Sequence, residues 1–336
     1  MGQLKGVGVA LVTPFNEDLS IDFDAITRLI DYNIDNGTSF LVVLGTTAEA
    51  ATLSKEEKER VVAHITKINN NRLPLVLGIG GNNTAEVVQQ IKESDLSDFD
   101  AILSVSPYYN KPNQEGLYQH YKALAETGEK IIIYNVPGRT GININVATVV
   151  ELAKHKNIVA MKDATDDIAY AMEVLTRTKD MDFDLYSGCD DNILPFIAAG
   201  GKGVISVLSN LYPRETEMFA QAALKGDLEL ARKMAYDLND VSKYLLLAIA
   251  DVESGLNPFA IGLVENNQNK LEAVKKYLTL INVKFIHKKG TSGMSIQASN
   301  YEDARKVYLI LTHFNLRNFD IGYPQINIKN IEKLNI

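Results

Sequence analysis

The sequence predicts an α/β fold, namely a closed (β/α)8 TIM barrel over residues 1–240 with an atypical, mainly helical segment over residues 241–336. Two observations lead to the barrel. Short apolar runs rich in β-branched residues alternate strictly with amphipathic segments, and this alternation indicates a parallel sheet with helical crossovers. Eight such units within about 240 residues match the usual size of a closed eight-stranded barrel.

The expected strands follow one another at regular intervals, and the last helical segment covers residues 213–238. The alternative is a doubly wound open sheet, which usually has a glycine fingerprint after its first strand. The run "VTPFNED" at 12–18 lacks that fingerprint, so the barrel is favoured. The eight expected strands are 6–15, 39–47, 73–81, 100–110, 130–138, 158–165, 183–191 and 203–210.

The bulk composition excludes several classes of protein. Of the 336 residues, 46% are hydrophobic and 23% are charged, as in ordinary globular proteins. The net charge is −8 and the pI is near 5.3, so the chain is not expected to bind nucleic acid. Cys189 is the single cysteine, which rules out an intrachain disulfide. No apolar stretch has the length of a membrane helix and no signal-peptide pattern is present, so we expect a cytoplasmic protein without a membrane segment.

The run "NIVAMKDAT" at 157–165 places a lysine at the end of an expected buried strand. Lysine is rarely buried without a partner, so Lys162 either marks the exit of the strand into solvent or serves chemistry in a protected pocket. The ends of the other strands decide between these readings, because each carries residues capable of chemistry and all of them converge on one face of a barrel. We therefore expect Lys162 to point toward a shared active-site mouth.

A lysine in such a mouth suggests covalent catalysis on a carbonyl substrate. Desolvation lowers the pKa of the amine, and the neutral amine can attack a ketone to form an imine. Tyr134, at the end of the preceding strand, is a candidate proton shuttle. Gly45, Thr46 and Thr47 end another strand just before a helix, where backbone N–H groups can hold a carboxylate. This chemistry needs no metal and no organic cofactor.

Five motifs together resemble the dihydrodipicolinate synthase family of lysine Schiff-base pyruvate aldolases and lyases. They are "GTTAEAATLS" (45–54), "SPYYNKPNQEGLYQHY" (106–121), "YNVPGRTG" (134–141), "KDAT" (162–165) and "GVISV" (203–207). The resemblance runs in order from residue 1 to about 240. It implies an enzyme of lysine and diaminopimelate biosynthesis that condenses pyruvate with aspartate 4-semialdehyde to give 4-hydroxy-tetrahydrodipicolinate. It also implies a homo-oligomer, a tetramer in the family.

The same resemblance assigns the site residues. Lys162 would form the imine with pyruvate, while Tyr134, Thr46 and Tyr109 would relay protons, with Tyr109 supplied by a neighbouring subunit. The residues implied to contact substrate or intermediate are Thr47 (pyruvate carboxylate), Arg139 (carboxylate of aspartate semialdehyde), Gly188 and Ile205 (backbone contacts).

Each of these assignments has a structural alternative. Thr46 and Thr47 could be plain helix caps, Tyr109 a core or surface tyrosine, and Arg139 a solvated loop cation. Ala48 stands where the family usually has glycine, which bears on the backbone geometry of that loop.

Some family members are inhibited by lysine at a subunit interface. The matching positions here are Ala50, Ala51, Lys55, Lys58, Asn82, Glu86 and Tyr108. Two lysines there would disfavour a cationic amino acid, so regulation by lysine stays open. The five histidines, His64, His120, His155, His287 and His313, show no metal-ligand spacing, and we expect structural or surface roles for them.

The segment after residue 240 resembles a different family. "ESGLNPFAIG" (253–262) and "GYPQIN" (322–327) are similar to motifs of lysozyme-like lytic transglycosylases, in which Glu253 would be the general acid that cleaves glycan. Helices are expected at 242–253 and 301–313. The alternative is that "VESGLNP" is a divergent form of the barrel family's own tail.

The sequence thus favours a Schiff-base synthase and leaves three rivals. The first is a retro-aldol lyase for a keto sugar acid, which has the same fold. The second is a peptidoglycan lytic transglycosylase acting through Glu253. The third is a composite chain in which neither site is fully competent.

Overall fold

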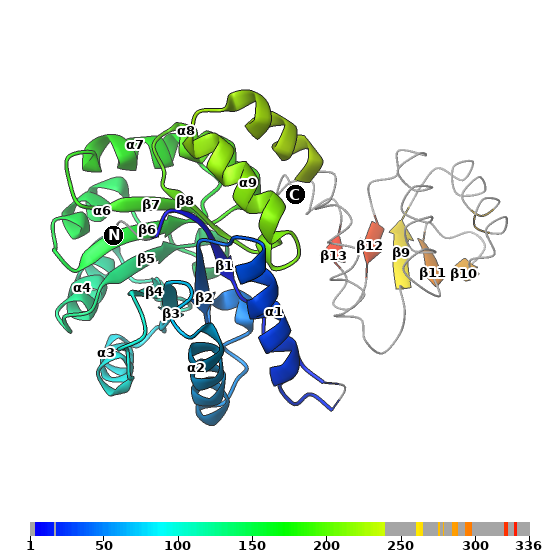
Figure 1. Cartoon of the computed structure of the whole chain (residues 1–336), viewed down its shortest axis with the longest axis horizontal. Helices are drawn as coiled ribbons and strands as arrows, with labels where there is room; N and C mark the ends of the chain where they lie inside the picture. Colours follow the sequence, from blue (N-terminus) through cyan, green and yellow to red (C-terminus); the bar gives the residue numbers. More distant parts are fainter. Residues whose placement is uncertain are drawn as a thin grey trace. The chain divides into compact units, whose positions relative to one another are not determined.

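The computed structural model describes residues 4–16, 18–238, 260–264, 275, 278, 284–287, 293–297, 319–321 and 326–327. The chain divides into two compact units, Met1–Ala235 and Tyr236–Ile336. In the first unit, eight parallel strands close into a barrel in the order β1 to β8, which confirms the predicted fold (Figure 1). No helix in the described part of the chain is long and apolar enough to cross a membrane.

The strands of the barrel are shorter than the apolar runs that predicted them, because the end of a run belongs to the loop that follows the strand. The run at 6–15, for example, is a strand only from Gly6 to Ala10. The eight strands are β1 (Gly6–Ala10), β2 (Phe40–Val43), β3 (Leu75–Gly78), β4 (Ala101–Val105), β5 (Ile131–Asn135), β6 (Ile158–Asp163), β7 (Asp184–Ser187) and β8 (Gly203–Ser206).

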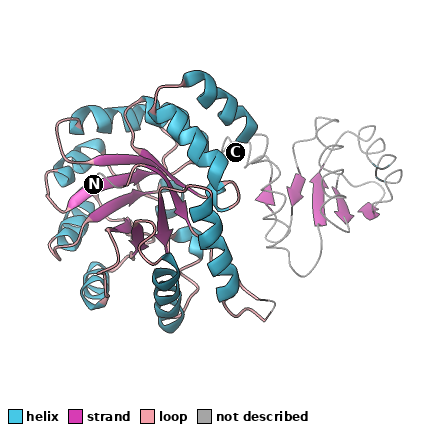
Figure 2. Ribbon diagram, viewed as in Figure 1, coloured by secondary structure: helices cyan, strands magenta, loops and turns pink. Residues whose placement is uncertain are grey.

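Helices surround the barrel and connect successive strands (Figure 2). Their starts are specified locally: the Ser54 hydroxyl accepts from the Glu57 N–H, and the Glu57 carboxylate accepts from the Ser54 N–H, which is a capping box. The helices are α1 (Phe23–Asp35), α2 (Lys55–Asn69), α3 (Thr84–Glu93), α4 (Gln114–Ala125), α5 (Pro137–Thr140), α6 (Val146–Ala153), α7 (Ile168–Thr178), α8 (Ile193–Ala198) and α9 (Pro213–Leu224).

The helix predicted over 213–238 is two helices. After α9 the chain turns at Lys225 and Gly226, and residues 228–238 form a second helix. Gly226 has φ +77°, a conformation that glycine adopts without strain, and the Asp227 carboxylate accepts from the Leu230 N–H at 3.1 Å. The glycine and the following aspartate therefore end one helix and begin the next.

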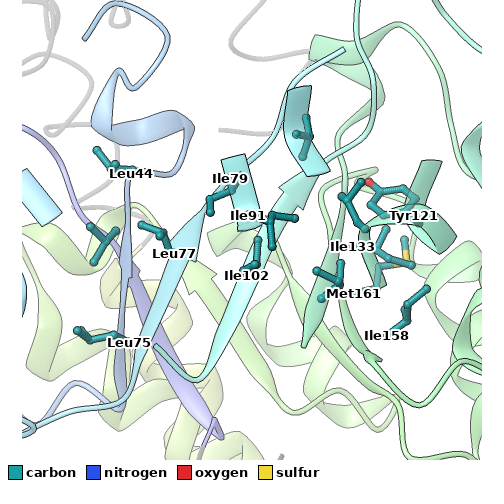
Figure 3. Packing of buried hydrophobic residues seen from close by; sticks show 14 of the residues in the cluster. Leu44, Leu75, Leu77, Ile79, Ile91, Ile102, Tyr121, Ile133, Ile158 and Met161 are labelled. Carbon is teal, nitrogen blue, oxygen red and sulfur yellow. The ribbon is translucent and has the colours of Figure 1, made fainter. Parts of the chain in front are cut away.

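Two hydrophobic clusters hold the barrel together. One lies inside it and includes Phe40, Ile132 and Tyr186, and the other lies between the strands and the helices. Figure 3 shows part of the second cluster, with Leu77 on β3, Ile102 on β4 and Met161 on β6. Side chains alternate between the two faces of each strand, so this double burial explains why the strand runs are continuously apolar.

In the second unit, most of the described residues lie in strands. β9 (Ala260–Val264), β10 (Lys284–His287), β11 (Gly293–Gln297), β12 (Phe319–Ile321) and β13 (Ile326–Asn327) form an antiparallel sheet in the order β10-β11-β9-β12-β13. The mainly helical character expected for residues 241–336 stays a prediction, because most of that segment lies outside the described residues. The run "GMSIQ" alternates apolar and polar residues, which is the strand pattern. The helices expected at 242–253 and 301–313 lie outside the described residues.

Candidate active site

Lys162 lies at the carboxyl end of β6, in the barrel and not at an exit into solvent. The residue is only 5% exposed. Ala160, two residues earlier on the same strand, belongs to the cluster inside the barrel, whereas Met161 belongs to the cluster outside it. The two-residue period of a strand therefore directs the Lys162 side chain inward.

Tyr134 lies beside Lys162 at the end of β5. The register of the parallel pair aligns the Cα of Tyr134 with that of Lys162, and the Lys162 Nζ lies 4.5 Å from the centroid of the Tyr134 ring. Burial raises the pKa of the Tyr134 phenol, while the nearby Arg139 charge and the Thr46 hydroxyl lower it. A phenol held in this way stays protonated near neutral pH and can donate a proton to a group on Lys162.

The pKa of Lys162 is lowered from 10.5 to about 8, mainly because burial removes water from the ammonium. Asp190 and Cys189 oppose this shift, and the positive charge of Arg139 adds to it. An amine with a pKa near 8 is neutral in a useful fraction at physiological pH. Lys162 can therefore act as a nucleophile without a separate base to deprotonate it.

Thr46 and Thr47 begin a 3-10 turn, η1 (Thr46–Ala48), directly after β2. Gly45 precedes the turn in an extended conformation, with φ −67° and ψ −178°. The first N–H groups of such a turn have no acceptor within it, so they are free to bind an anion. Ala48 is buried in the turn, and the left-handed conformation falls on Glu49, at φ +55°. The alanine at position 48 therefore causes no backbone strain.

Arg139 lies on α5, a single helical turn between β5 and α6, and it is exposed at this end of the barrel. The turn is closed by hydrogen bonds from the N–H groups of Arg139 and Thr140 to the Val136 carbonyl, at 2.9 and 3.0 Å. It ends at Gly141, with φ +73°. The guanidinium contributes to the electrostatic environment of both Lys162 and Tyr134.

Gly188 directly follows β7, the strand that pairs with β6, and Ile205 lies in β8. A Cβ on Gly188 would lie 3.1 Å from the Lys162 Cε and 2.7 Å from the Ala164 Cβ, so the lysine stem packs against the bare backbone there. Ile205 is fully buried on β8 within the inner cluster. Gly188 therefore brings bare backbone against the lysine stem.

Tyr108 and Tyr109 follow β4 on the same face of the barrel. Tyr109 is 89% exposed and has φ +71°, an uncommon conformation for a tyrosine. Its phenol points into solvent within this chain, whereas Tyr134 and Lys162 are buried together. The structure thus places Thr46, Tyr134, Arg139 and Lys162 in one environment and leaves Tyr109 apart from them.

Asp190 is a site residue that the sequence analysis did not single out. One carboxylate oxygen, Oδ2, accepts from the N–H groups of Val207 and Leu208 at 3.1 Å each. The other, Oδ1, is buried and has no hydrogen-bond partner in the part of the chain that the structure describes. Its charge favours the ammonium form of Lys162. The "SGCDD" run at the end of β7 carried the signal, since a carboxylate three residues beyond a barrel strand end is a site candidate.

The positions matched to lysine regulation lie on the loops after β2, β3 and β4 and on the adjoining helices. Lys55 Nζ lies 4.0 Å from Glu59, and the Asn110 side chain donates to the Asn82 carbonyl at 3.0 Å. The Glu86 carboxylate accepts from Asn83 at 2.8 Å. A regulatory role for Ala50, Ala51, Lys55, Lys58, Asn82, Glu86 and Tyr108 stays a prediction.

Glu253, the predicted glycan-cleaving acid, lies outside the described residues. Within the described residues, no group of three His, Cys, Asp or Glu side chains could hold a metal ion. His64 and His120 accept or donate hydrogen bonds with Thr27 and Thr84, each at 2.8 Å, which are structural contacts between helices.

Comparison with known proteins extends the resemblance seen in the sequence. A model of the dihydrodipicolinate synthetase family matches residues 3–265. Over 235 residues the chain is 53% identical to the 4-hydroxy-tetrahydrodipicolinate synthase of Flavobacterium psychrophilum, covering 69% of this chain and 80% of the relative. It is 46% identical over 268 residues to the enzyme of the same name from Phocaeicola vulgatus, covering 79% and 89%. The crystal structure of dihydrodipicolinate synthase from Aquifex aeolicus matches with a TM-score of 0.70 and 36% identity, covering 93% of this chain and 99% of that one.

These matches bear on the segment after residue 240 as well. The family match continues to residue 265 and therefore includes Glu253. That extent favours the reading in which "VESGLNP" belongs to the barrel family's own tail. The resemblance to lytic transglycosylases gains no support from the comparisons.

Proposed function

Because the chain belongs to the dihydrodipicolinate synthetase family, we propose that it condenses pyruvate with aspartate 4-semialdehyde to give 4-hydroxy-tetrahydrodipicolinate. It is then a class I lyase of lysine and diaminopimelate biosynthesis that uses no metal and no organic cofactor. The observation that carries the proposal is a buried Lys162 whose amine lies 4.5 Å from the ring of Tyr134.

The first step forms a covalent bond between Lys162 and pyruvate. The neutral amine attacks the keto carbon to give a carbinolamine, which takes up one proton and loses water, so that a protonated imine remains on Nζ. The imine withdraws electrons from the methyl carbon, which loses a proton and becomes a nucleophilic enamine. Asp190 supports the positive charge of the imine, because its carboxylate already favours the charged form of the lysine.

The second step joins the two substrates. The enamine carbon attacks the aldehyde carbon of aspartate semialdehyde, the aldehyde oxygen takes up a proton, and the imine on Lys162 is restored. The amino group of aspartate semialdehyde then attacks the imine carbon, the ring closes, and the Lys162 amine leaves and frees the product. Tyr134 and Thr46 are the relay for these protons, with Tyr109 from a partner subunit as the connection to solvent. The raised pKa of the Tyr134 phenol keeps it protonated until a base forms next to it.

Two anion sites orient the substrates. The N–H groups at the start of η1 (Thr46–Ala48) receive the pyruvate carboxylate at Thr47, and Arg139 receives the carboxylate of aspartate semialdehyde. Backbone groups of Gly188 and Ile205 contact the intermediate beside the lysine stem. Because Tyr109 faces away from its own site, the complete site requires a homo-oligomer, with a tetramer as the family arrangement.

The decisive experiment traps the imine. Incubation with pyruvate and borohydride, followed by peptide mass mapping, is expected to place a reduced pyruvate adduct on Lys162. The variant Lys162→Arg, which keeps the charge, is expected to carry none. Folded wild-type protein that gives no adduct would contradict the synthase and the retro-aldol lyase alike.

A second assay separates these two enzymes. The synthase requires condensation of pyruvate with aspartate semialdehyde, whereas a retro-aldol lyase would release pyruvate from a keto sugar acid. Clearing of peptidoglycan that Glu253→Gln abolishes would instead support the glycan-cleaving alternative.

A further inference from the structure

A buried polar network lies directly behind the proposed catalytic pair. The register that aligns Tyr134 with Lys162 also aligns the next residues, Asn135 and Asp163. Successive strand residues point to opposite faces, so these two lie outside the barrel wall. Asn135 is fully buried and Asp163 is 3% exposed. Two polar residues in such a position need partners, and those partners connect them to the loop that carries Arg139.

Asn135 is the centre of the network. Its Nδ2 donates to Asp163 Oδ1 at 3.2 Å and to Asn143 Oδ1 at 2.7 Å. Its Oδ1 accepts from the backbone N–H of Ile144 at 3.2 Å. Both donors and the oxygen of one amide are thus directed at β6 on one side and at residues 143–144 on the other.

Asp163 fixes which way the Asn135 amide points. A carboxylate only accepts hydrogen bonds, so Asn135 must present its NH2 group to it. The Asn135 oxygen is then left for Ile144. The second carboxylate oxygen, Oδ2, accepts from the Thr165 hydroxyl at 2.8 Å, which fixes Asp163 in turn. Burial raises the pKa of Asp163 to about 6, so at neutral pH the carboxylate form prevails.

Two further contacts hold the same end of the loop. Gln114 donates to the Asn143 carbonyl at 2.8 Å and accepts from the Asn145 N–H at 2.9 Å. The Tyr170 hydroxyl on α7 donates to the Ile144 carbonyl at 2.6 Å. Arg139 therefore lies on a short segment whose start is β5 itself and whose end, residues 143–145, is fixed by side chains from β5, α4 and α7.

We infer that Asn135 and Asp163, acting through Asn143, are positioning residues that hold Arg139 against the carboxylate of the second substrate. The inference rests on the proposed function. It explains how the site would select an aldehyde that bears a carboxylate. The strands that carry Tyr134 and Lys162 also carry the groups that place the arginine. The same network thus fixes the position of the second substrate site relative to the lysine that binds pyruvate.

The test uses Asn143, because its side chain is exposed and its replacement leaves the barrel core untouched. Asn143→Ala removes the acceptor of the 2.7 Å hydrogen bond. We expect the KM for aspartate semialdehyde to rise about tenfold, the upper part of the range for one lost hydrogen bond. The KM for pyruvate and the yield of borohydride-trapped adduct on Lys162 are expected to stay at wild-type values. Asn143→Asp keeps an acceptor oxygen and is expected to restore the KM for the aldehyde.

Asn36→Ala is the matched control. Asn36 also makes side-chain hydrogen bonds, with Tyr32 and Arg214, but it caps the end of α1, at the opposite end of the barrel. Its replacement should leave both KM values unchanged. An unchanged KM for the aldehyde in Asn143→Ala, or equal changes in both KM values and in adduct yield, would overturn the inference. Wild-type protein that forms no adduct would instead overturn the proposed function.

Discussion

The chemistry of a single residue, Lys162, is set by opposing effects of its surroundings. Removal from water disfavours the ammonium, and the negative charge of Asp190 favours it. Desolvation is the larger effect, since the pKa falls from 10.5 to about 8. The carboxylate nevertheless has a use, because the imine that replaces the amine is reactive only when protonated. The same surroundings therefore favour the neutral amine that attacks pyruvate and stabilise the protonated imine that follows.

This balance predicts the pH dependence of imine formation. Only neutral Lys162 attacks pyruvate, so the rate of adduct formation should rise with pH through about 8. Asp190→Asn keeps an acceptor for the Val207 and Leu208 N–H groups but removes the charge. Without that charge the pKa of Lys162 falls further, so the rise should occur at lower pH. Borohydride trapping at a series of pH values measures both profiles, and coincident profiles would show that Asp190 does not act on the lysine.

The phenol of Tyr134 should matter for turnover more than for binding. Tyr134→Phe keeps the ring beside the Lys162 Nζ and removes the proton donor. We expect kcat to fall about 10²- to 10⁴-fold, the usual contribution of a positioned acid or base. The pyruvate adduct should still form on prolonged incubation. Steady-state kinetics and adduct mapping on one preparation test both statements, and an unchanged kcat would exclude Tyr134 from the relay.

Sequence reasoning found the residues that end strands and missed those that support them. Lys162, Tyr134 and Thr46 stand out because a polar group follows an apolar run. Asn135 and Asp163 follow the same runs one position later and look like ordinary exits into solvent. Only the register of β5 and β6 shows that they are buried on the outer face. A single sequence does not contain that pairing.

At the scale of elements, the closure of the barrel depends on close contact between its first and last strands. β1 pairs in parallel with β8, with Gly6 opposite Gly203. Gly203 has φ +155°, and a Cβ there would lie 1.9 Å from the Gly6 carbonyl oxygen. The alternation of strands and helices predicted a closed barrel, but it could not indicate which glycine makes closure possible. That depends on an approach between residues almost 200 positions apart in the chain.

Gly203→Ala is therefore expected to destabilise the barrel. Both the backbone conformation and the clash with Gly6 oppose a side chain, and we expect a loss of about 2–4 kcal/mol in the free energy of unfolding. Gly138→Ala is the matched control, because no atom lies within 4 Å of its Cβ position and its φ is not in the positive range. Urea denaturation followed by circular dichroism gives both values. Equal stability of the two variants would contradict this account of closure.

At the scale of the whole molecule, the two units differ in how far sequence patterns determine them. The barrel could be predicted because an apolar run and an amphipathic segment alternate eight times within about 240 residues. Beyond residue 240 there is no such repetition, and short runs such as "KFIH" are compatible with either strand or helix. The family match ends at residue 265, which lies past the boundary between the two units at residues 235–236.

The exposure of Tyr109 leads to a prediction about assembly. If its phenol completes the site of a partner subunit, each site combines Lys162 of one subunit with Tyr109 of another. Lys162→Ala and Tyr109→Phe are then each inactive, but for the loss of different halves of the site. Hetero-oligomers of the two variants should then recover activity, up to about a quarter of the wild-type sites when subunits mix at random across two-fold interfaces.

Lys162→Ala mixed with Tyr134→Phe is the control, because both residues belong to the same chain's site and no mixed subunit pair restores it. Co-expression with two different tags and isolation of mixed oligomers allows the measurement. If mixed oligomers of Lys162→Ala and Tyr109→Phe stay inactive, Tyr109 acts within its own chain. The loop after β4 would then have to change its conformation for the Tyr109 phenol to reach Tyr134.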